Sequence, residues 1–507
     1  MRILNAEQLR AADLFTIKTE GILSVELMER AAKECYKWIE KQLPHDVHFA
    51  VLCGLGNNGG DGWAIAGLLK EAGKTVHVYA LAGEQLSADN ALKKKEYVEI
   101  KSDFTYLSDA CISAISEADV LVDALFGTGL NRPLEKDISS IITEINRLSI
   151  FKVAIDTPSG FFADAPMPDK AIALQANVTL CFHAPRLMYL FEESEKWVGD
   201  WQVLDIGLKV NELALAQTAG LGTYQYTLRS DLNGALPRNS VFAHKGTNGH
   251  SLLVGGMKGK MGAMVLAARA CLRSGTGLCS VYVPSAALGI LQTAVPEAMV
   301  FESEEEWQVS GSFNAEHFSA IGFGPGAGKH EATGKLLKYL IQTVNGNLLI
   351  DADGLNLLAE NPTWLSFLPP NTVLTPHPGE LDRLCGKAAS GYERLENAIK
   401  LSLKTGAVVV LKGAYTAVCS PSGAVYFNST GNNGMAKGGS GDVLSGIITA
   451  LLALGISALT AARLGVFVHG VAGDVAAREV GKIAMHASDI IQFLPAAWKS
   501  ISAQTNE

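Results

Sequence analysis

The sequence predicts an α/β protein of two domains, with a doubly wound parallel sheet in the first half and a second α/β sheet in the other. Three observations lead to this prediction. A chain of 507 residues is too long for one ordinary hydrophobic core. Both halves alternate short apolar runs with amphipathic helical patterns, which is typical of strands joined by crossover helices. Several apolar runs end in glycine-rich or acidic loops, and ligand sites of such folds lie at the carboxyl ends of parallel strands.

The composition excludes some functional classes. Hydrophobic residues make up 48% of the chain and charged residues 18%, which suits large, well-buried α/β domains. The net charge is −9 and no basic run is interleaved with aromatic residues, so we expect no nucleic-acid partner. The eight cysteines include no C-x-x-C pair and several lie in apolar runs. They are interpreted as reduced, buried thiols of a cytoplasmic protein.

No targeting or membrane-spanning segment is predicted. Glu7, Arg10 and Asp13 interrupt any apolar run near the N-terminus, so we expect no signal peptide. Residues 443–462 carry no charge and are long enough to cross a bilayer. Gly455, however, is a helix-stop signal and Ser457 a new N-cap, so the stretch is interpreted as two buried helices.

The first half begins with two predicted helices, over residues 5–18 and 23–43. A strand at 48–53 leads through the loop GLGNNGGDG (54–62) into a helix at about 61–72. Strand, glycine loop and helix in this order predict a Rossmann-like, doubly wound domain. Further strands are expected at 75–80, 119–123, 151–156 and 178–182.

Polar side chains follow three of these strands. Asn58 lies in the first loop, Asp123 ends a strand before FGTGLNRP (126–133), and DTPSG (156–160) contains Ser159. Together Asn58, Asp123 and Ser159 offer one carboxylate and two neutral oxygens, a set compatible with a monovalent cation. The alternative for each residue is ordinary, since an Asp that ends a strand often only caps the next helix.

The second half follows a junction that we place at residues 213–228, between domains at 1–212 and 229–507. The junction shows no clear strand. Beyond it a helix is expected at 262–274, with strands at 250–255, 278–283, 320–323, 348–351 and 407–411. The strand-end loops are GFGPGAG (322–328), DADGLN (351–356), TPHPGEL (375–381) and LKGAYT (411–416). Lys412 is available there to a phosphate or to the protein's own carboxylates.

The stretch NNGMAKGGSGDVLSG (432–446) carries the strongest chemical signal. A glycine-rich loop that enters a helix N-terminus gathers unpaired N–H groups where the helix dipole favours negative charge, as in phosphate sites. Asp442 would repel phosphate, so its better role is that of a general base for a neighbouring hydroxyl. The alternative is an Asp that only caps the helix.

Residues 1 to about 210 resemble the epimerase domain of the NAD(P)H-hydrate repair enzymes, through GLGNNGGDG, DALFGTGLNRP and DTPSG. The resemblance implies interconversion of the R and S forms of hydrated NADH or NADPH, a potassium site on Asn58, Asp123 and Ser159, and Asp156 as substrate contact and acid/base. The other substrate contacts that it implies are Asn57, Asn58, Gly59, Gly60, Asp61, Gly127, Thr128, Gly129, Leu130, Asn131, Arg132 and Pro133.

Residues of about 230–500 resemble the ribokinase-like superfamily and, within it, the NAD(P)H-hydrate dehydratases. The GSGD loop is common to the superfamily, whereas TPHPGE, the HKG at 244–246 and NGMAKGG are more specific to the dehydratases. Two departures from the family pattern are Asn433, where proline is expected, and Lys437, where a small hydroxyl residue is commoner. The resemblance implies substrate contacts at Ala263, Gly326, His377 and Asp442, and nucleotide contacts at Lys412, Gly413, Ala414, Tyr415, Thr416 and Gly441.

These parts imply a mechanism. Asp442 would activate the C6 hydroxyl of the hydrate, which takes the terminal phosphoryl group of ADP or ATP and then leaves as phosphate. Mg²⁺ would accompany the nucleotide. The sequence does not decide between ADP and ATP, but the resemblance to bacterial two-domain members favours ADP. The resemblance also implies a homo-oligomer. The alternatives are a kinase for a vitamin precursor or sugar, with a stable product, and a non-catalytic first domain that binds a ligand or protein. The joint presence of Asn58, Asp123, Asp156 and Ser159 argues against the second.

Overall fold

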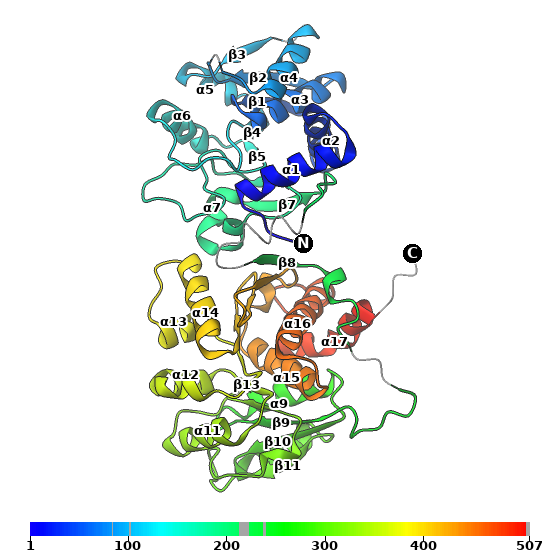
Figure 1. The fold of residues 1–507 in the computed structure, drawn as a ribbon, viewed down its shortest axis with the longest axis vertical. Helices are drawn as coiled ribbons and strands as arrows, with labels where there is room; N and C mark the ends of the chain where they lie inside the picture. The colour runs from blue at the N-terminus through cyan, green and yellow to red at the C-terminus, as the bar shows by residue number, and fades with distance from the viewer. Residues whose placement is uncertain (84, 101–102, 212–222, 237–239, 503–507) are drawn as a thin grey trace. The chain divides into compact units, whose positions relative to one another are not determined.

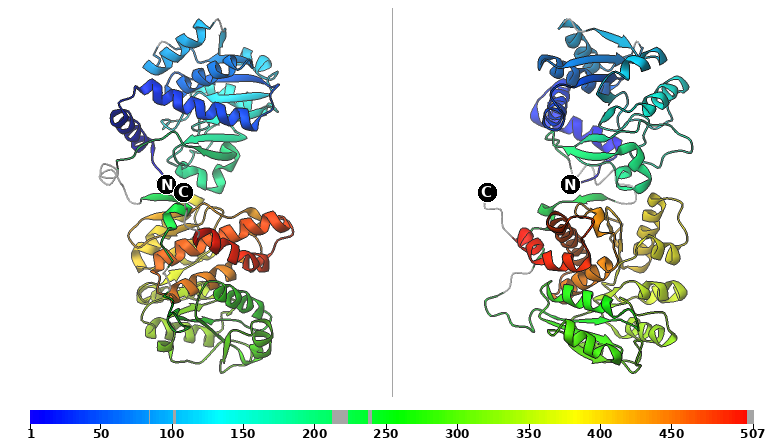
Figure 2. Two further views of the ribbon diagram at one scale, coloured as in Figure 1. Left: turned by 90° about the vertical axis from the view of Figure 1, so that its right-hand side faces the viewer. Right: turned by 180° about the vertical axis from the view of Figure 1, so that it is seen from behind.

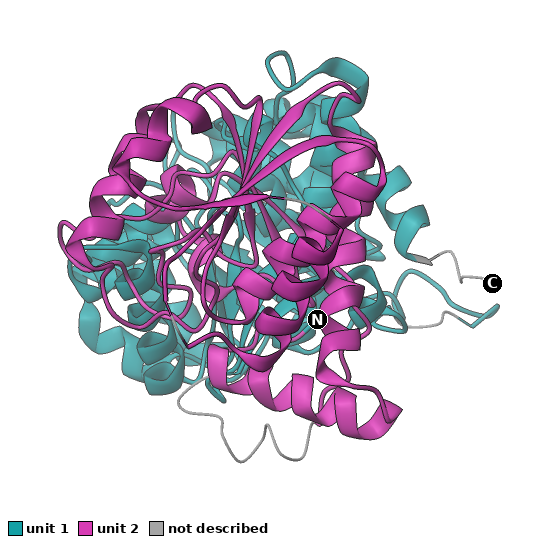
Figure 3. Ribbon diagram, turned by 90° about the horizontal axis from the view of Figure 1, so that it is seen from above, with its two compact units in different colours: residues 1, 221–507 teal, residues 2–220 magenta. Residues whose placement is uncertain are grey.

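The computed structural model describes residues 1–83, 85–100, 103–211, 223–236 and 240–502. The chain divides into two compact units, Arg2–Gly220 and Leu221–Glu507 together with Met1 (Figure 3). We call them the first and the second unit. Each contains its own sheet of mainly parallel strands, so the predicted α/β class is confirmed. Most of the predicted junction, residues 213–222, lies outside the described residues, and the boundary stays a prediction.

The first unit is built on a seven-stranded sheet in the order β3-β2-β1-β4-β5-β6-β7. All its neighbouring strands are parallel. The order reverses between β1 and β4, which is the switch point where doubly wound folds bind ligands. The strands are β1 (His48–Cys53), β2 (Thr75–Ala80), β3 (Phe104–Tyr106), β4 (Val120–Ala124), β5 (Phe151–Ile155), β6 (Val178–Phe182) and β7 (Asp200–Leu204).

Helices cover both faces of this sheet, because alternate residues of each strand point to opposite sides. In β1, Phe49, Val51 and Cys53 join one core with α2 and α3, whereas Ala50 and Leu52 join another with α6. The helices of the unit are α1 (Ala6–Glu20), α2 (Ser24–Gln42), α3 (Asn57–Glu71), α4 (Ala88–Glu99), α5 (Ile112–Ile115), α6 (Lys136–Arg147) and α7 (Glu195–Val198).

The second unit has a ten-stranded sheet in the order β11-β10-β9-β12-β13-β14-β15-β16-β17-β8. Only the pairs β15–β16 and β16–β17 of this sheet are antiparallel. The strands are β8 (Tyr224–Thr227), β9 (His250–Val254), β10 (Leu278–Val283), β11 (Met299–Glu302), β12 (Ala320–Phe323), β13 (Leu348–Ile350), β14 (Val373–Leu374), β15 (Val408–Leu411), β16 (Ala417–Cys419) and β17 (Val425–Asn428).

Helices flank the second sheet on two sides, with α11 to α14 along one and α9 and α15 to α17 along the other (Figure 1 and Figure 2). The side with α15 contains a large apolar core, in which α15 is buried over nearly its whole surface. The helices are α9 (Met261–Leu272), α10 (Leu288–Ala294), α11 (Glu331–Thr343), α12 (Asp353–Glu360), α13 (Pro378–Cys385), α14 (Gly391–Thr405), α15 (Ser440–Ala453), α16 (Ala458–Val480) and α17 (Ala487–Ser502).

Three predictions about single elements have clear outcomes. The uncharged stretch 443–462 is divided between α15 and α16, with Ser457 Oγ accepting a hydrogen bond from Thr460 N, as predicted. No described helix is long and apolar enough to span a bilayer. Two predictions were wrong: a strand, β8, does lie in the region assigned to the junction, and Cys385 is exposed, although the other seven cysteines are buried.

Candidate active sites of the two units

The polar loops of the first unit converge at the carboxyl ends of β1, β4 and β5, next to the switch point of the sheet. The loop after β1 is shorter than predicted, because α3 already begins at Asn57. Asn57 to Asp61 are therefore the first five residues of a helix, with Asn57 exposed at its start and Asp61 buried.

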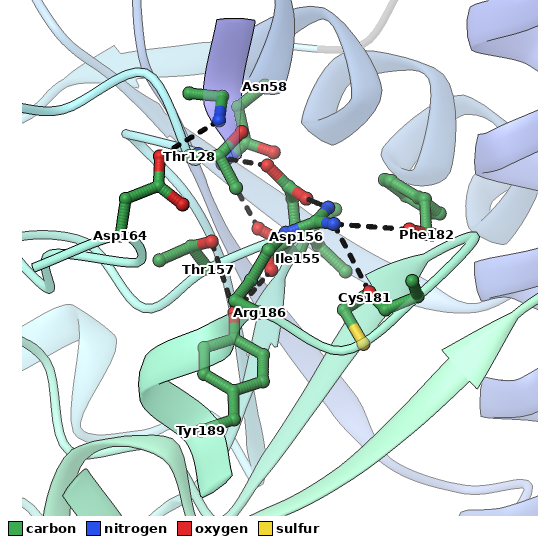
Figure 4. A network of polar contacts seen from close by, with 12 residues as sticks. Asn58, Thr128, Ile155, Asp156, Thr157, Asp164, Cys181, Phe182, Arg186 and Tyr189 are labelled. Atoms are coloured by element: carbon green, nitrogen blue, oxygen red, sulfur yellow. Dashed lines mark hydrogen bonds and ion pairs between the residues drawn. The ribbon is translucent and has the colours of Figure 1, made fainter. Parts of the chain in front are cut away.

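Asp156 is the most firmly held carboxylate of this site (Figure 4). Its backbone has a positive φ of 65°, and Tyr189 Oη donates a hydrogen bond to its carbonyl oxygen at 2.7 Å. Its carboxylate accepts from Arg186 Nη2 at 2.5 Å and from the backbone N–H of Thr128 at 3.0 Å. Arg186 is only 2% exposed, and its Nε atom is buried without a hydrogen-bond partner. The arrangement fixes one carboxylate at the site in a defined orientation.

The predicted substrate loop 127–133 passes directly beside Asp156. A Cβ atom on Gly127 would lie 2.8 Å from Asp156 Oδ2, which explains why glycine is needed there. A Cβ atom on Gly129 would lie 2.8 Å from Arg10 Nη2, so α1 also reaches this loop. Thr128 and Leu130 are half-buried, whereas the predicted contacts Asn131, Arg132 and Pro133 are exposed.

The three residues predicted to hold potassium lie close together. Asp123 is fully buried and accepts hydrogen bonds from Ser159 Oγ at 2.6 Å and from Ser159 N at 2.8 Å. Asn58 donates to the carbonyl oxygen of Ile155 at 3.2 Å, while its Oδ1 atom is buried without a partner. Burial raises the pKa of Asp123 to about 6, although Ser159 and Leu125 donate to it. A buried carboxylate that no cationic side chain among the described residues faces, together with an unpaired amide oxygen, fits a monovalent cation.

The charge of Asp156 also acts on two further carboxylates, Asp61 and Asp13. Burial, reinforced by the charge of Asp156, raises the pKa of Asp61 well above its usual range and that of Asp13 to about 6. Gly59 and Gly60, predicted as substrate contacts, are buried in α3. Their missing side chains leave room for Gly54 O and for the Met28 side chain, so packing explains both glycines.

Sequence reasoning missed three residues of this site, Arg186, Tyr189 and Asp13. Arg186 and Tyr189 belong to HAPRLMYLF, which follows β6. An arginine inside an apolar run after a strand end was a usable signal, because a buried cation needs a carboxylate partner. Asp13 gave no such signal, since a polar residue near the chain start is usually solvated.

The site of the second unit surrounds the N-terminus of α15. Gly439 has a φ of 93° and precedes the helix, whose first residues are Ser440, Gly441 and Asp442. The free N–H groups of this turn can bind phosphate. Burial, with a smaller contribution from Asp351, raises the pKa of Asp442 to about 7. Asp442 is therefore a carboxylate that can accept and release a proton near neutral pH.

A buried ion-pair network lies beneath this turn. Lys412 Nζ is 2.8 Å from Asp351 Oδ1 and 3.7 Å from Glu380 Oε2. Ser445 Oγ donates to Asp351 Oδ2 at 2.6 Å. Burial opposes the charge of Lys412, but Asp351 and Glu380 outweigh it and raise the pKa of the lysine. Of the two roles predicted for Lys412, the structure has the pairing with the protein's own carboxylates. A Cβ atom on Gly441 would lie 3.5 Å from Lys412 Nζ, so the lysine also lies close to the phosphate loop.

The other predicted residues of the second unit line the same edge of the sheet. A Cβ on Gly326 would lie 3.3 Å from Ala263 Cβ, so these two predicted substrate contacts are adjacent. His377 is the N-cap of α13, where its Nδ1 accepts from Gly379 N at 3.0 Å. Burial and nearby Lys412 lower the pKa of His377. The predicted nucleotide contacts Gly413, Ala414, Tyr415 and Thr416 form the turn after β15, closed by hydrogen bonds between Gly413 and Thr416.

The two departures from the family pattern, Asn433 and Lys437, lie before Gly438 and Gly439 of the phosphate loop. Asn433 begins a short 3₁₀ turn capped by Asn432, whose side chain accepts from Gly434 N at 3.0 Å. Lys437 Nζ donates to the carbonyl oxygen of Ile483 at 2.5 Å. Sequence reasoning missed Asp351, Glu380 and Ser445, although Asp351 is the first residue of the strand-end motif DADGLN that it had singled out.

Two family models match the chain, one in each half. The model described as YjeF-related protein N-terminus matches residues 24–188, and the model described as NAD(P)H-hydrate dehydratase matches residues 251–496.

Curated relatives match over nearly the full length. A bifunctional NAD(P)H-hydrate repair enzyme of Moorella thermoacetica is 35% identical, over 99% of this chain and 98% of that protein. The enzyme of the same description from Escherichia coli is 35% identical, over 96% of this chain and 92% of that protein.

Solved structures match the second half. A ribokinase-like superfamily protein of Enterococcus faecalis is 29% identical with a TM-score of 0.49, over 55% of this chain and 96% of that chain. An ADP/ATP-dependent NAD(P)H-hydrate dehydratase of Bacillus subtilis, co-crystallized with ATP/Mg²⁺, is 27% identical with a TM-score of 0.48, over 55% of this chain and 98% of that chain. With 35% identity to a curated relative along 99% of its length, the chain belongs to the family of bifunctional NAD(P)H-hydrate repair enzymes.

Proposed function

We propose that the chain repairs hydrated NADH and NADPH, with one reaction in each unit. The first unit interconverts the R and S hydrates, and the second removes water from the S hydrate at the expense of ADP. Family membership and the two separate polar sites support this assignment. The observation that carries it is Asp442, a carboxylate in the first turn of α15, next to a glycine turn suited to phosphate and with a pKa of about 7.

In the second unit, Asp442 takes the proton of the C6 hydroxyl as the hydroxyl oxygen attacks the terminal phosphoryl group of ADP. The N–H groups around Gly441 stabilise the charge that develops on the transferred group. Phosphate then leaves C6, a proton leaves the neighbouring carbon, and the ring double bond is restored. Lys412 holds the turn electrostatically through Asp351, which Ser445 of α15 also contacts.

Magnesium would enter this site with the nucleotide. No group of three or more acidic, cysteine or histidine side chains among the described residues could hold a metal by itself. Mg²⁺ commonly binds through one or two carboxylates and the substrate phosphates, which fits such a site. The ion would neutralise phosphate charge during transfer.

In the first unit, Asp156 exchanges a proton with the oxygen that leaves or joins the carbon that is inverted. Arg186 and Thr128 N hold its carboxylate in place. Potassium would be held by Asp123, Ser159 and the free Oδ1 of Asn58. There it would offset the buried charge of Asp123 and fix the loop ends.

The remaining assignments complete the proposal. Ala263, Gly326 and His377 contact the substrate in the second unit, and Lys412 to Thr416 with Gly441 contact ADP. In the first unit the substrate lies along the first turn of α3 and the loop 127–133. A homo-oligomeric, cytoplasmic protein is part of the proposal, and light scattering on the purified protein tests the oligomer.

The deciding experiment follows NADH absorbance after purified protein receives mixed R and S hydrates, Mg²⁺, K⁺ and either ADP or ATP. Full conversion, faster than spontaneous epimerisation, supports both activities and identifies the nucleotide. Conversion that stops when the S form is exhausted removes the epimerase assignment. A stable phosphorylated product would instead favour a kinase for another substrate.

A further inference from the structure

Helix α1 forms part of the first unit's site, although it precedes the matched family model, which begins at residue 24. Asn5 caps the helix, and Ala6 N donates to Asp164 Oδ2 at 2.8 Å. Arg10 Nη2 lies beside Gly129 of the substrate loop. Residues 6, 10 and 13 are spaced to share one helix face. This face of α1 therefore borders the site.

Asp13 is the acidic residue on that face. Its carboxylate interacts electrostatically with Asp156, Arg186 and Asp61, which places it among the charged groups of the site. It is half-buried, and no hydrogen bond or ion pair joins it to another described residue. Asp156, by contrast, is held by Arg186 and Thr128 N. Asp13 is thus free to meet both substrate and solvent.

The proposed epimerisation requires two proton-transfer groups. Inverting a carbon that carries a hydroxyl by loss and return of water needs an acid for the departing hydroxyl and a base for the incoming water, on opposite faces of the ring. Asp156 supplies one of them. The second must be a group that can change its protonation state next to the same carbon.

We propose that Asp13 is the second proton-transfer residue of the epimerase site, acting on the ring face opposite to Asp156. This inference rests on the function proposed above. In one direction, Asp13 gives its proton to the hydroxyl, the C–O bond breaks and water leaves, while the lone pair of the ring nitrogen forms a C=N bond. A water molecule then adds to the other face, the C=N pair returns to nitrogen, and the released proton goes to Asp156. The opposite epimer follows the same steps with the two carboxyl groups exchanged.

The raised pKa of Asp13, about 6 through burial and the charge of Asp156, suits this exchange near neutral pH. Asp61 is the rival candidate, because it also has no hydrogen-bond partner among the described residues. Asp61 is only 9% exposed, near the start of α3, where burial disfavours its charged form more strongly. Asp13 has the access to solvent that renewed protonation requires.

The test measures epimerisation of purified R hydrate by chromatography, without nucleotide and with K⁺, in the full chain. The variants are Asp13→Asn, Asp13→Glu, Asp61→Asn and, as a matched control on the same helix, Glu7→Gln, since Glu7 is exposed in the first turn of α1. We expect Asp13→Asn to lower kcat by about 10²–10⁴-fold with little change in KM. It should also remove one limb of the pH–rate profile, which the loss of a merely structural residue would leave in place. Asp13→Glu should recover part of the rate, and Glu7→Gln should match the wild type.

Unchanged thermal unfolding and unchanged dehydration of the S hydrate would show that Asp13→Asn is folded. A wild-type rate in Asp13→Asn overturns the inference and leaves the proposed function standing. A raised KM with a normal kcat in Asp13→Asn would also overturn the inference. A loss of epimerisation in Asp61→Asn alone would do the same. Loss of activity in Glu7→Gln equal to that of Asp13→Asn would also overturn it. An inactive wild type, by contrast, contradicts the proposed function itself.

Discussion

Asp351 and Lys412 form a buried ion pair directly beneath the phosphate turn, with Lys412 Nζ 2.8 Å from Asp351 Oδ1. Asp351 is 2% exposed, so removal of the lysine leaves a buried carboxylate without its cation. We expect Lys412→Met to destabilise the second unit by about 3–5 kcal/mol. The measurement is the thermal transition of that unit, and Lys412→Met with Asp351→Asn should recover part of the loss. Equal stability of Lys412→Met and wild type would contradict the pairing.

Asp442→Asn should remove dehydration but not folding. Loss of a positioned base lowers the rate by about 10²–10⁴-fold. The raised pKa of Asp442 means that its ionisation costs stability as pH rises toward about 7. The variant, which lacks this charge, should therefore melt at the same temperature or higher at pH 8. Epimerisation by the same sample is the control, and an intact dehydration rate would exclude Asp442 as the base.

The dehydration rate should depend on pH through the same residue. A base must be ionised, and the pKa of Asp442 is about 7, so the rate should fall as the pH drops below that value. The pH profile of kcat/KM for the S hydrate measures this. A rate that stays constant between pH 5 and 8 would mean that another group accepts the proton.

Potassium should stabilise the first unit as well as activate it. Without a cation the pKa of Asp123 is raised to about 6, because the buried charge is disfavoured. Stabilisation by K⁺ should therefore grow as the pH rises to about 6 and level off above it, and it should vanish well below pH 6, where Asp123 binds a proton instead. Thermal unfolding in KCl and in choline chloride of equal ionic strength tests this. Asp123→Asn should abolish the difference, and a K⁺ effect that survives in this variant would place the ion elsewhere.

Two neighbouring glycines should differ sharply in their tolerance of alanine. The new Cβ of Gly127→Ala would lie 2.8 Å from Asp156 Oδ2, whose carboxylate Arg186 fixes in place. That of Gly129→Ala would meet only the end of the flexible Arg10 side chain. We expect epimerisation to fall strongly in Gly127→Ala and to be nearly retained in Gly129→Ala. Equal rates in the two variants would show that the loop can shift away from Asp156.

The strands that the sequence predicted best are the fully buried parallel ones. The predicted bounds of β1, β6, β10 and β12 agree with the structure, because such strands are nearly continuous apolar runs. Those of β2 also agree, although Thr75 and His77 are exposed. The edge strands β3, β7, β8 and β11 were missed, since few of their residues are buried and they form no long apolar run. The short strands β16 and β17 were also missed. The start of α3 was also misplaced, because the glycines of its first turn are explained only by packing against Gly54 and Met28.

The residues of the candidate sites were also predicted only in part. Loops at strand ends were recognisable, so the sequence located Asp156, Asp123 and Asp442. The sequence did not reveal the partner of Asp156, because Arg186 is 30 positions away along the chain and pairs with it only in the folded unit. The sequence also left two roles open for Lys412, and its pairing with Asp351 becomes visible only in the folded unit.

Strand β8 has a practical consequence for separating the two activities. It pairs with β17 as the last strand of the second sheet, yet it precedes the matched dehydratase model, which begins at residue 251. A fragment cut at that residue would leave the N–H and C=O groups of β17 uncovered, and a bare edge of this kind recruits strands from other molecules. Such a fragment should aggregate during expression. The shortest well-behaved dehydratase therefore begins upstream of Tyr224.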